Sequence, residues 1–215
     1  MLFNLDLPTL ITRLIILVTA FSVHEFAHAW VANSFGDDTP RLYGRLTLNP
    51  AAHLDVMGSL MLLFAGFGWA KPVPINPYAL RRRSNAAVMW VSLAGPFSNL
   101  LMAGLAAIPF RIGLTNVFYA SGTFLPTLPQ FLMEFIFINL LLMLFNLIPL
   151  FPLDGEKVLE YFLPAQQSRA LENIRPYSPL ILFAIVFIGP AIGLNILQWI
   201  ISPPLEFLMR LLVGI

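Results

Sequence analysis

Residues 8–35 read PTLITRLIILVTAFSVHEFAHAWVANSF. This apolar run exceeds the roughly 20 residues that a helix needs to cross a bilayer. Its ionisable residues are Arg13 and a cluster of three, His24, Glu25 and His28. Because ionisable side chains are costly inside a membrane, such a cluster is typical of a functional site. The stretch therefore predicts a membrane-spanning helix that carries chemistry.

Three further apolar runs of similar length follow, at about residues 86–110, 131–151 and 178–201. The run at 57–69 is too short to cross, and its glycines favour a re-entrant or β-hairpin-like membrane segment near residues 57–76. We therefore expect an all-α polytopic membrane protein with about four full transmembrane helices, the first over about 8–35, plus this partial insertion.

The composition excludes the other broad classes of protein. Of the 215 residues, 58% are hydrophobic, 11% are charged and none is Cys, whereas soluble domains average about 45–50% apolar and about 25% charged residues. The same values exclude a disordered chain and a disulfide-stapled secreted scaffold. A net charge of +1 argues against nucleic acid as a partner. We expect residues 1–215 to form a single membrane-embedded domain whose surroundings are the lipid bilayer.

The placement of Lys and Arg predicts the orientation of the chain. Nine of the 12 basic residues fall in the connections that follow the first and third runs, and the other three lie toward the opposite side. Because basic residues collect on the cytoplasmic side of membrane proteins, these two connections should face the cytoplasm. Both termini are then expected outside, with residues 203–215 as a short amphipathic helix in the outer interface.

The cluster in the first run has the pattern H-E-x-x-H over residues 24–28. Positions i and i+4 of a helix share one face, so the imidazoles of His24 and His28 can reach a single ion. Glu25 projects in an adjacent direction and could take a proton from a metal-bound water without being a ligand. Because a catalytic zinc site usually has three protein ligands and one open position, a third ligand is expected elsewhere in the chain.

Asp154 is the strongest candidate for that third ligand. It follows the third run in the stretch NLIPLFPLDG, residues 146–155. Two prolines loosen the end of the helix there, and Gly155 lets the backbone turn closely around the carboxylate. The predicted orientation brings His28 and Asp154 to the same side of the membrane at similar depth. Taken alone, Asp154 could also be an ordinary turn or capping residue before a glycine.

HEFAH in the first run, together with the later NLIPLFPLDG, resembles the site-2 protease family of intramembrane metalloproteases. Three more stretches share the character of the family's bacterial members: NPAAHLD at 49–55, GWAKPVPIN at 68–76 and AGPFSN at 94–99. The resemblance implies one Zn²⁺ per chain, held by His24, His28 and Asp154, with Glu25 as the general base.

The same resemblance implies the reaction and its setting. The expected reaction is hydrolysis of peptide bonds within or next to transmembrane segments of membrane-protein substrates, as in regulated intramembrane proteolysis. The chain resembles compact prokaryotic members without an appended PDZ or CBS domain. We therefore expect an integral protein of a prokaryotic plasma membrane, with its active site near the cytoplasmic side.

Three further residues are candidates for supporting roles. Asn146 and Asn99 are amides in apolar runs, where each could bind the substrate backbone or an oxyanion, or could simply join helices. His53 could hydrogen-bond a metal ligand or contact the metal itself, although a turn before the partial insertion is the favoured interpretation. The alternating, proline-containing residues 71–75 could offer a sheet edge to an extended substrate, or could form a membrane-surface loop.

The alternative function is a non-proteolytic membrane metal-binding protein, either a transporter or a scaffold. Transport favours ionisable residues spread through several spans, whereas the candidates here cluster at one depth. A structural zinc site favours four closed ligands and has no use for Glu25. The protease interpretation is therefore the expected one.

Overall fold

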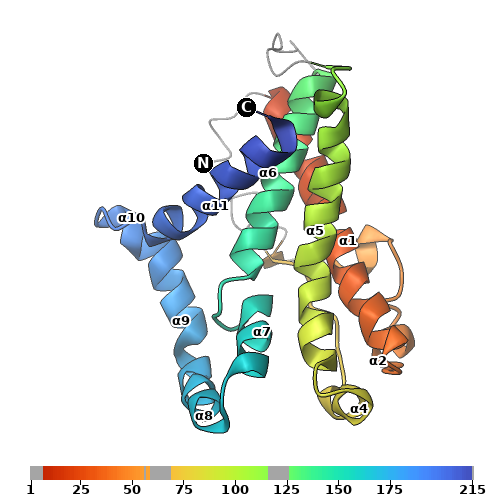
Figure 1. Ribbon diagram of the computed structural model, residues 1–215, viewed down its shortest axis with the longest axis vertical. Coiled ribbons are helices and arrows are strands. Elements are labelled where there is room, and N and C mark those ends of the chain that lie inside the picture. Colours follow the sequence, from red (N-terminus) through yellow and green to blue (C-terminus); the bar gives the residue numbers. More distant parts are fainter. Residues whose placement is uncertain (1–6, 56, 59–68, 116–125, 215) are drawn as a thin grey trace.

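The computed structural model describes residues 7–55, 57–58, 69–115 and 126–214, and these residues are almost entirely helical (Figure 1). Three long helices form the centre of the molecule: α1 (Leu7–Ser34), α5 (Ala87–Arg111) and α6 (Leu128–Asn146). Helix α5 packs against both of the others. Within the described ranges there is no strand, and one isolated antiparallel bridge joins Leu54 to Ala70. The expectation of an all-α membrane protein is confirmed.

Small residues let the central helices approach each other closely. Ala103 and Ala107 of α5 are buried against Ile136 and Leu140 of α6, while Ala32 of α1 is buried in a second cluster with residues 87, 88 and 91 of α5. In lipid, where apolar burial between helices gives little driving force, such close contact is what holds helices together. The packing places α5 beside both elements that bear the candidate ligands.

Short elements connect the long helices. They are α2 (Thr39–Leu42), the 3₁₀ turn η2 (Pro50–Ala52) and α4 (Pro77–Arg83) before α5, and then α7 (Asp154–Phe162), α8 (Ala165–Ile174) and the 3₁₀ turn η3 (Arg175–Tyr177) after α6. Most of the predicted partial insertion at 57–69 lies outside the described residues.

Gly155 explains how α7 returns to the centre of the molecule. A Cβ atom at this position would lie 2.2 Å from the carbonyl oxygen of Leu147. Real side chains do not tolerate so short a contact, so glycine is what allows the first turn of α7 to rest against the end of α6. Asp154, the first residue of α7, is thereby turned back toward α1.

The last part of the chain differs in its boundaries from the predicted span at 178–201. The helix that begins with α9 (Ser178–Phe183) continues through a π-helical turn, η4 (Ala184–Ile188), and ends with α10 (Gly189–Ala191). Gly193, with a φ of 81°, then turns the chain, and α11 (Ile196–Val213) follows. The expected interfacial tail is thus the second half of α11, which packs on α5 and α6 because its own residues are apolar.

Within the described residues, five helices are long and apolar enough to cross a membrane: Thr9–Ser34, Ala87–Arg111, Leu128–Asn146, Ala165–Ala191 and Ile196–Val213. In Figure 1 the chain rises through α9 and α10 and then runs obliquely through α11 to the end of the molecule where α1 begins. At that end the guanidinium of Arg111 donates to the carbonyl of Leu212 over 2.9 Å, which joins the ends of α5 and α11.

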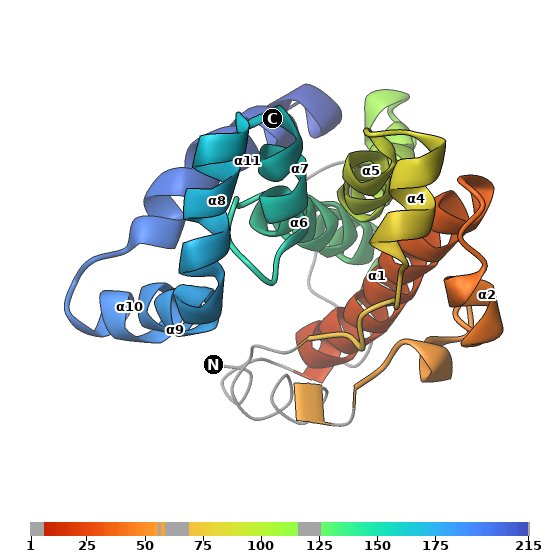
Figure 2. The ribbon, with the colours of Figure 1, turned by 90° about the horizontal axis from the view of Figure 1, so that it is seen from below.

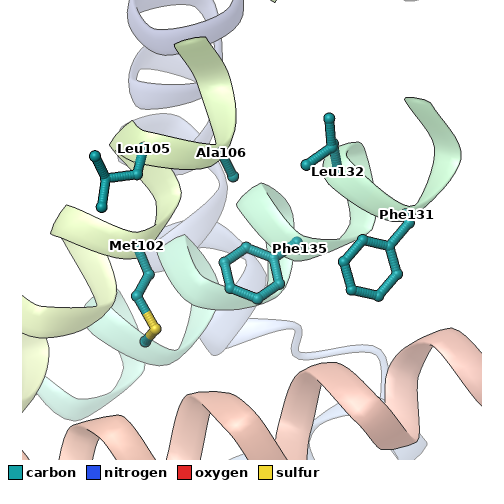
Figure 3. A pocket seen from close by; sticks show the side chains of 6 residues that line it. All are labelled: Met102, Leu105, Ala106, Phe131, Leu132 and Phe135. Atoms are coloured by element: carbon teal, nitrogen blue, oxygen red, sulfur yellow. The ribbon is translucent and has the colours of Figure 1, made fainter. Parts of the chain in front are cut away.

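A shallow apolar hollow lies between α5 and α6 (Figure 3). The side chains that line it are Met102, Leu105, Ala106, Phe131, Leu132 and Phe135. All six are apolar, so the hollow offers no group for chemistry and has the character of a lipid-facing surface.

Candidate metal centre

Three side chains from α1 and α7 converge on one point. The Nε2 atoms of His24 and His28, one helical turn apart, are 3.0 Å from each other. They lie 3.2 Å and 3.3 Å, respectively, from Oδ2 of Asp154. A tetrahedral zinc ion with bonds of about 2.0–2.1 Å holds its ligand atoms about 3.3–3.4 Å apart, so the observed spacing is close to that of a ligand set. Across the part of the chain that the structure describes, no other three side chains of this kind approach so closely.

A chain of hydrogen bonds sets the protonation of His24. The amide of Asn139 donates to the carbonyl oxygen of Phe135 over 2.9 Å, and that carbonyl can only accept. Oδ1 of Asn139 therefore accepts from the amide of Asn99 over 2.9 Å, which turns Oδ1 of Asn99 toward Nδ1 of His24 at 2.6 Å. Nδ1 must carry the proton, so Nε2 of the neutral imidazole presents its lone pair to the site.

His28 is oriented in the same way by α5. Its Nδ1 lies 2.6 Å from the backbone carbonyl oxygen of Val91, so this nitrogen donates. In the neutral imidazoles both Nε2 lone pairs then face each other and Oδ2 of Asp154, a buried oxygen with no hydrogen-bond donor among the described residues. Electron pairs that converge in this way repel one another unless a proton or a cation lies between them. The residues therefore fit a metal ion, which would take the place of such a proton.

Gly95 of α5 lies directly against both imidazoles. A Cβ atom there would lie 2.4 Å from Nε2 of His28 and 2.5 Å from Nε2 of His24. It would also lie 2.6 Å from Cε1 of His24, so it would press on the ring itself. The missing side chain is therefore what lets α5 lie so close to the two histidines.

Glu25 lies next to this group without belonging to it. Its carboxylate is half-buried, and Oε2 accepts a hydrogen bond of 3.2 Å from the backbone N–H of Val73. The ligand group contains His24, His28 and Asp154 but not this carboxylate. That separation of a ligand set from a neighbouring base is what metal-assisted hydrolysis needs.

The other predicted residues have different surroundings. Asn99 is fully buried behind His24, and the hydrogen bonds just described occupy both of its polar atoms. His53 is fully buried and donates from Nε2 to the carbonyl of Thr47 over 2.7 Å, so the structure does not bring it into the ligand group. Asn146 is half-buried, and its amide donates to the carbonyl of Leu142, one turn earlier in α6.

Four residues at the site escaped the sequence analysis: Val91, Asn139, Gly95 and Val73. Asn139 carried a signal, since it is an amide within an apolar run, as Asn146 is. Gly95 and Val73 lie in the stretches AGPFSN and GWAKPVPIN, but nothing in those stretches alone indicates which atoms they face.

An ion-pair network outside the long helices fixes α7, and with it Asp154. The buried Glu156 accepts a 2.7 Å hydrogen bond from Nε of Arg175, and Glu160 accepts from Lys157 at 2.9 Å and from Arg81 at 3.2 Å. Burial acts to raise the pKa of the Glu160 carboxyl, but the hydrogen bond from Lys157 and the nearby positive charges outweigh it and hold that pKa below its usual range. The network ties α7 to α4 and η3.

A bundle of apolar helices that brings an H-E-x-x-H pair and a distant aspartate to one point defines a membrane protein with a metallopeptidase-like site. The chain belongs to Peptidase family M50, the site-2 protease family. The family model matches residues 112–189, which include Asp154 but not the histidine pair.

Two relatives illustrate the similarity. YwhC of Bacillus subtilis, which carries the provisional name of a zinc metalloprotease, is 42% identical over 178 residues, covering 82% of this chain and 80% of YwhC. Rip2 of Mycobacterium tuberculosis strain H37Rv, also provisionally named a zinc metalloprotease, is 30% identical over 185 residues, covering 82% of this chain and 66% of Rip2. No solved structure gives a significant match.

Proposed function

We propose that this chain is an intramembrane zinc endopeptidase that hydrolyses peptide bonds within or next to transmembrane segments of membrane proteins. The observation that carries the proposal is that two imidazole Nε2 atoms and a carboxylate oxygen lie 3.0–3.3 Å from one another. The imidazoles lie on one apolar helix, and the carboxylate lies in the segment that follows another apolar helix. The names of YwhC and Rip2 support zinc as the metal. His24, His28 and Asp154 are the proposed ligands of one Zn²⁺ per chain.

Glu25 is the proposed general base. Zinc, when bound, would supply a Lewis acid that lowers the pKa of water and polarises the scissile carbonyl. Glu25 takes the proton from the attacking water and gives it to the leaving amine. Asn99 holds the imidazole of His24 in the tautomer that leaves Nε2 free, and the Val91 carbonyl does the same for His28.

The surroundings of the site support a membrane-protein substrate. A site between apolar helices favours a substrate that is itself in the membrane and that presents an extended backbone for attack. Asn146, half-buried at the end of α6, is the proposed contact for that backbone. We further propose that residues 1–215 act as one membrane-embedded domain, with the site toward the cytoplasm and both termini outside, as the distribution of Lys and Arg favours.

Metal content and cleavage test the proposal separately. Zinc is measured in detergent-purified wild type, Asp154→Ala and Glu25→Gln. Cleavage is measured by co-expressing each form with a panel of doubly tagged single-span membrane proteins. We expect about one zinc per chain in the wild type and Glu25→Gln, little in Asp154→Ala, and cleavage by the wild type alone. Zinc content in Asp154→Ala equal to that of the wild type would show that Asp154 is not a ligand. Cleavage by Glu25→Gln would refute the role of Glu25 as the general base.

A further inference from the structure

Residues 70–76, here named the strap, run beside α1 and lead into α4 (Figure 2). The strap contains the sequence Ala-Lys-Pro-Val-Pro-Ile-Asn. Its middle residue, Val73, donates its backbone N–H to Oε2 of Glu25 over 3.2 Å. The proposed general base is therefore in contact with the backbone of a segment 48 residues away in sequence.

The two prolines make this donor unusual. Pro72 and Pro74 have no backbone N–H, so Val73 supplies the single amide donor of these three residues. A residue before proline is also held in an extended conformation, and both Lys71 and Val73 precede one. The sequence thus stiffens the strap and leaves one N–H to point from its centre.

Both ends of the strap are fixed to the rest of the molecule. At the first end, the N–H of Lys71 donates to the carbonyl of His53 over 2.7 Å, and the guanidinium of Arg45 donates to the carbonyl of Lys71 over 3.3 Å. At the other end, the N–H of Asn76 donates over 2.6 Å to the carboxylate of Asp37, a fully buried residue just after α1. His53 therefore acts here as an anchor of the strap.

We propose that the Val73 N–H is the positioning group for Glu25, and that the strap exists to hold this N–H in place. A glutamate side chain has three rotatable bonds, so a half-buried carboxylate without a fixed partner samples several orientations. A hydrogen bond to Oε2 selects one of them and leaves the second oxygen free to receive the proton of the attacking water. Misplacement of a reacting group by about 1 Å costs about 100-fold in rate.

The inference rests on the proposed function for its kinetic part, but the hydrogen bond can be tested without any substrate. Val73→Pro removes the N–H and retains the extended backbone, while Val73→Ala trims the side chain and retains the N–H. The carboxylate stretching band of Glu25 is isolated as the infrared difference between each protein and its Glu25→Gln form. We expect the band to shift in Val73→Pro and to stay in place in Val73→Ala.

Kinetics with a cleavable substrate then test the positioning role. We expect kcat to fall about 100-fold in Val73→Pro, with KM and zinc content as in the wild type. In Val73→Ala, which keeps the N–H, we expect a much smaller decrease in kcat. If Val73→Pro loses zinc or helicity, the same measurements are made with an ester in place of the amide at position 73, which removes the N–H without adding a ring. An unshifted band, or unchanged or increased kcat, in the protein without the Val73 N–H overturns the inference. If the band shifts in Val73→Pro but the wild type cleaves no substrate, the result contradicts the proposed function instead.

Discussion

Replacement of Gly95 by alanine is expected to weaken metal binding although none of the three proposed ligand residues is changed. The new methyl carbon would lie 2.4 Å and 2.5 Å from the two Nε2 atoms, inside the 3.0 Å that real Cβ contacts respect. The methyl group would therefore displace both imidazoles from their places against α5 and disturb their spacing to Oδ2 of Asp154.

The size of the effect follows from how the histidines are held. To move away from the methyl group, His28 must leave the Val91 carbonyl, and His24 must leave Asn99. Breaking a buried hydrogen bond costs about 1–3 kcal/mol, so two cost about 2–6 kcal/mol. That corresponds to metal affinity weakened by about 30-fold to 10⁴-fold.

Competition with a chromophoric chelator measures this affinity on detergent-purified protein. Gly104→Ala is the matched control, because it lies on the same helix and a Cβ atom there meets nothing within 4 Å. We expect Gly104→Ala to bind zinc as the wild type does. If Gly95→Ala remains helical and its affinity lies within threefold of the control, metal binding does not depend on this placement of His24 and His28, and the ligand geometry is refuted.

Two other predictions concern the support of the site. Asn139→Ala removes the acceptor that orients Asn99. Loss of a residue that supports a metal ligand typically weakens metal affinity about 10–100-fold. If the same chelator competition gives the wild-type affinity, His24 needs no such support. Lowering the pH is expected to weaken the attachment of α7, because the pKa of Glu160 is depressed in the folded protein. The contribution of Glu160 to stability is present above the carboxyl pKa of the unfolded chain. It is lost as the pH falls through the folded-state pKa. Thermal unfolding of wild type and Glu160→Gln is measured from about pH 7 to about pH 3. The acid-induced loss of thermal stability should be smaller in the variant, and parallel curves would contradict this role.

The apolar runs were sufficient to predict the central helices. Length and hydropathy identify α1, α5 and α6, because in lipid a helix must satisfy its own backbone and be apolar throughout. The same signal misplaced the boundaries after residue 178, since 178–201 is apolar on both sides of the turn at Gly193. Hydropathy records that a segment avoids water, but not where it bends.

At the site, sequence reasoning could identify candidate ligands but not their supports. The i, i+4 spacing in α1 is a local geometric fact, so the side-by-side position of His24 and His28 follows from the helix alone. Asn99 and His24 are 75 residues apart, and Asn139 lies 40 residues beyond Asn99. Such contacts arise from helix packing and leave no periodic pattern in the chain. The metal and catalytic roles of these residues remain predictions for the experiments above.

Helix α5 provides none of the proposed ligands, yet the Val91 carbonyl, Asn99 and the bare backbone at Gly95 determine where the two histidines lie. This has a consequence for how catalytic members of such a family can be told from inactive ones. A related chain could keep H-E-x-x-H and the later aspartate, and still be a dead enzyme if a side chain stands at the position of Gly95. The residue at the position of Gly95 is therefore the informative one for recognising such pseudoproteases. It performs no chemistry, and it contributes only by lacking a side chain.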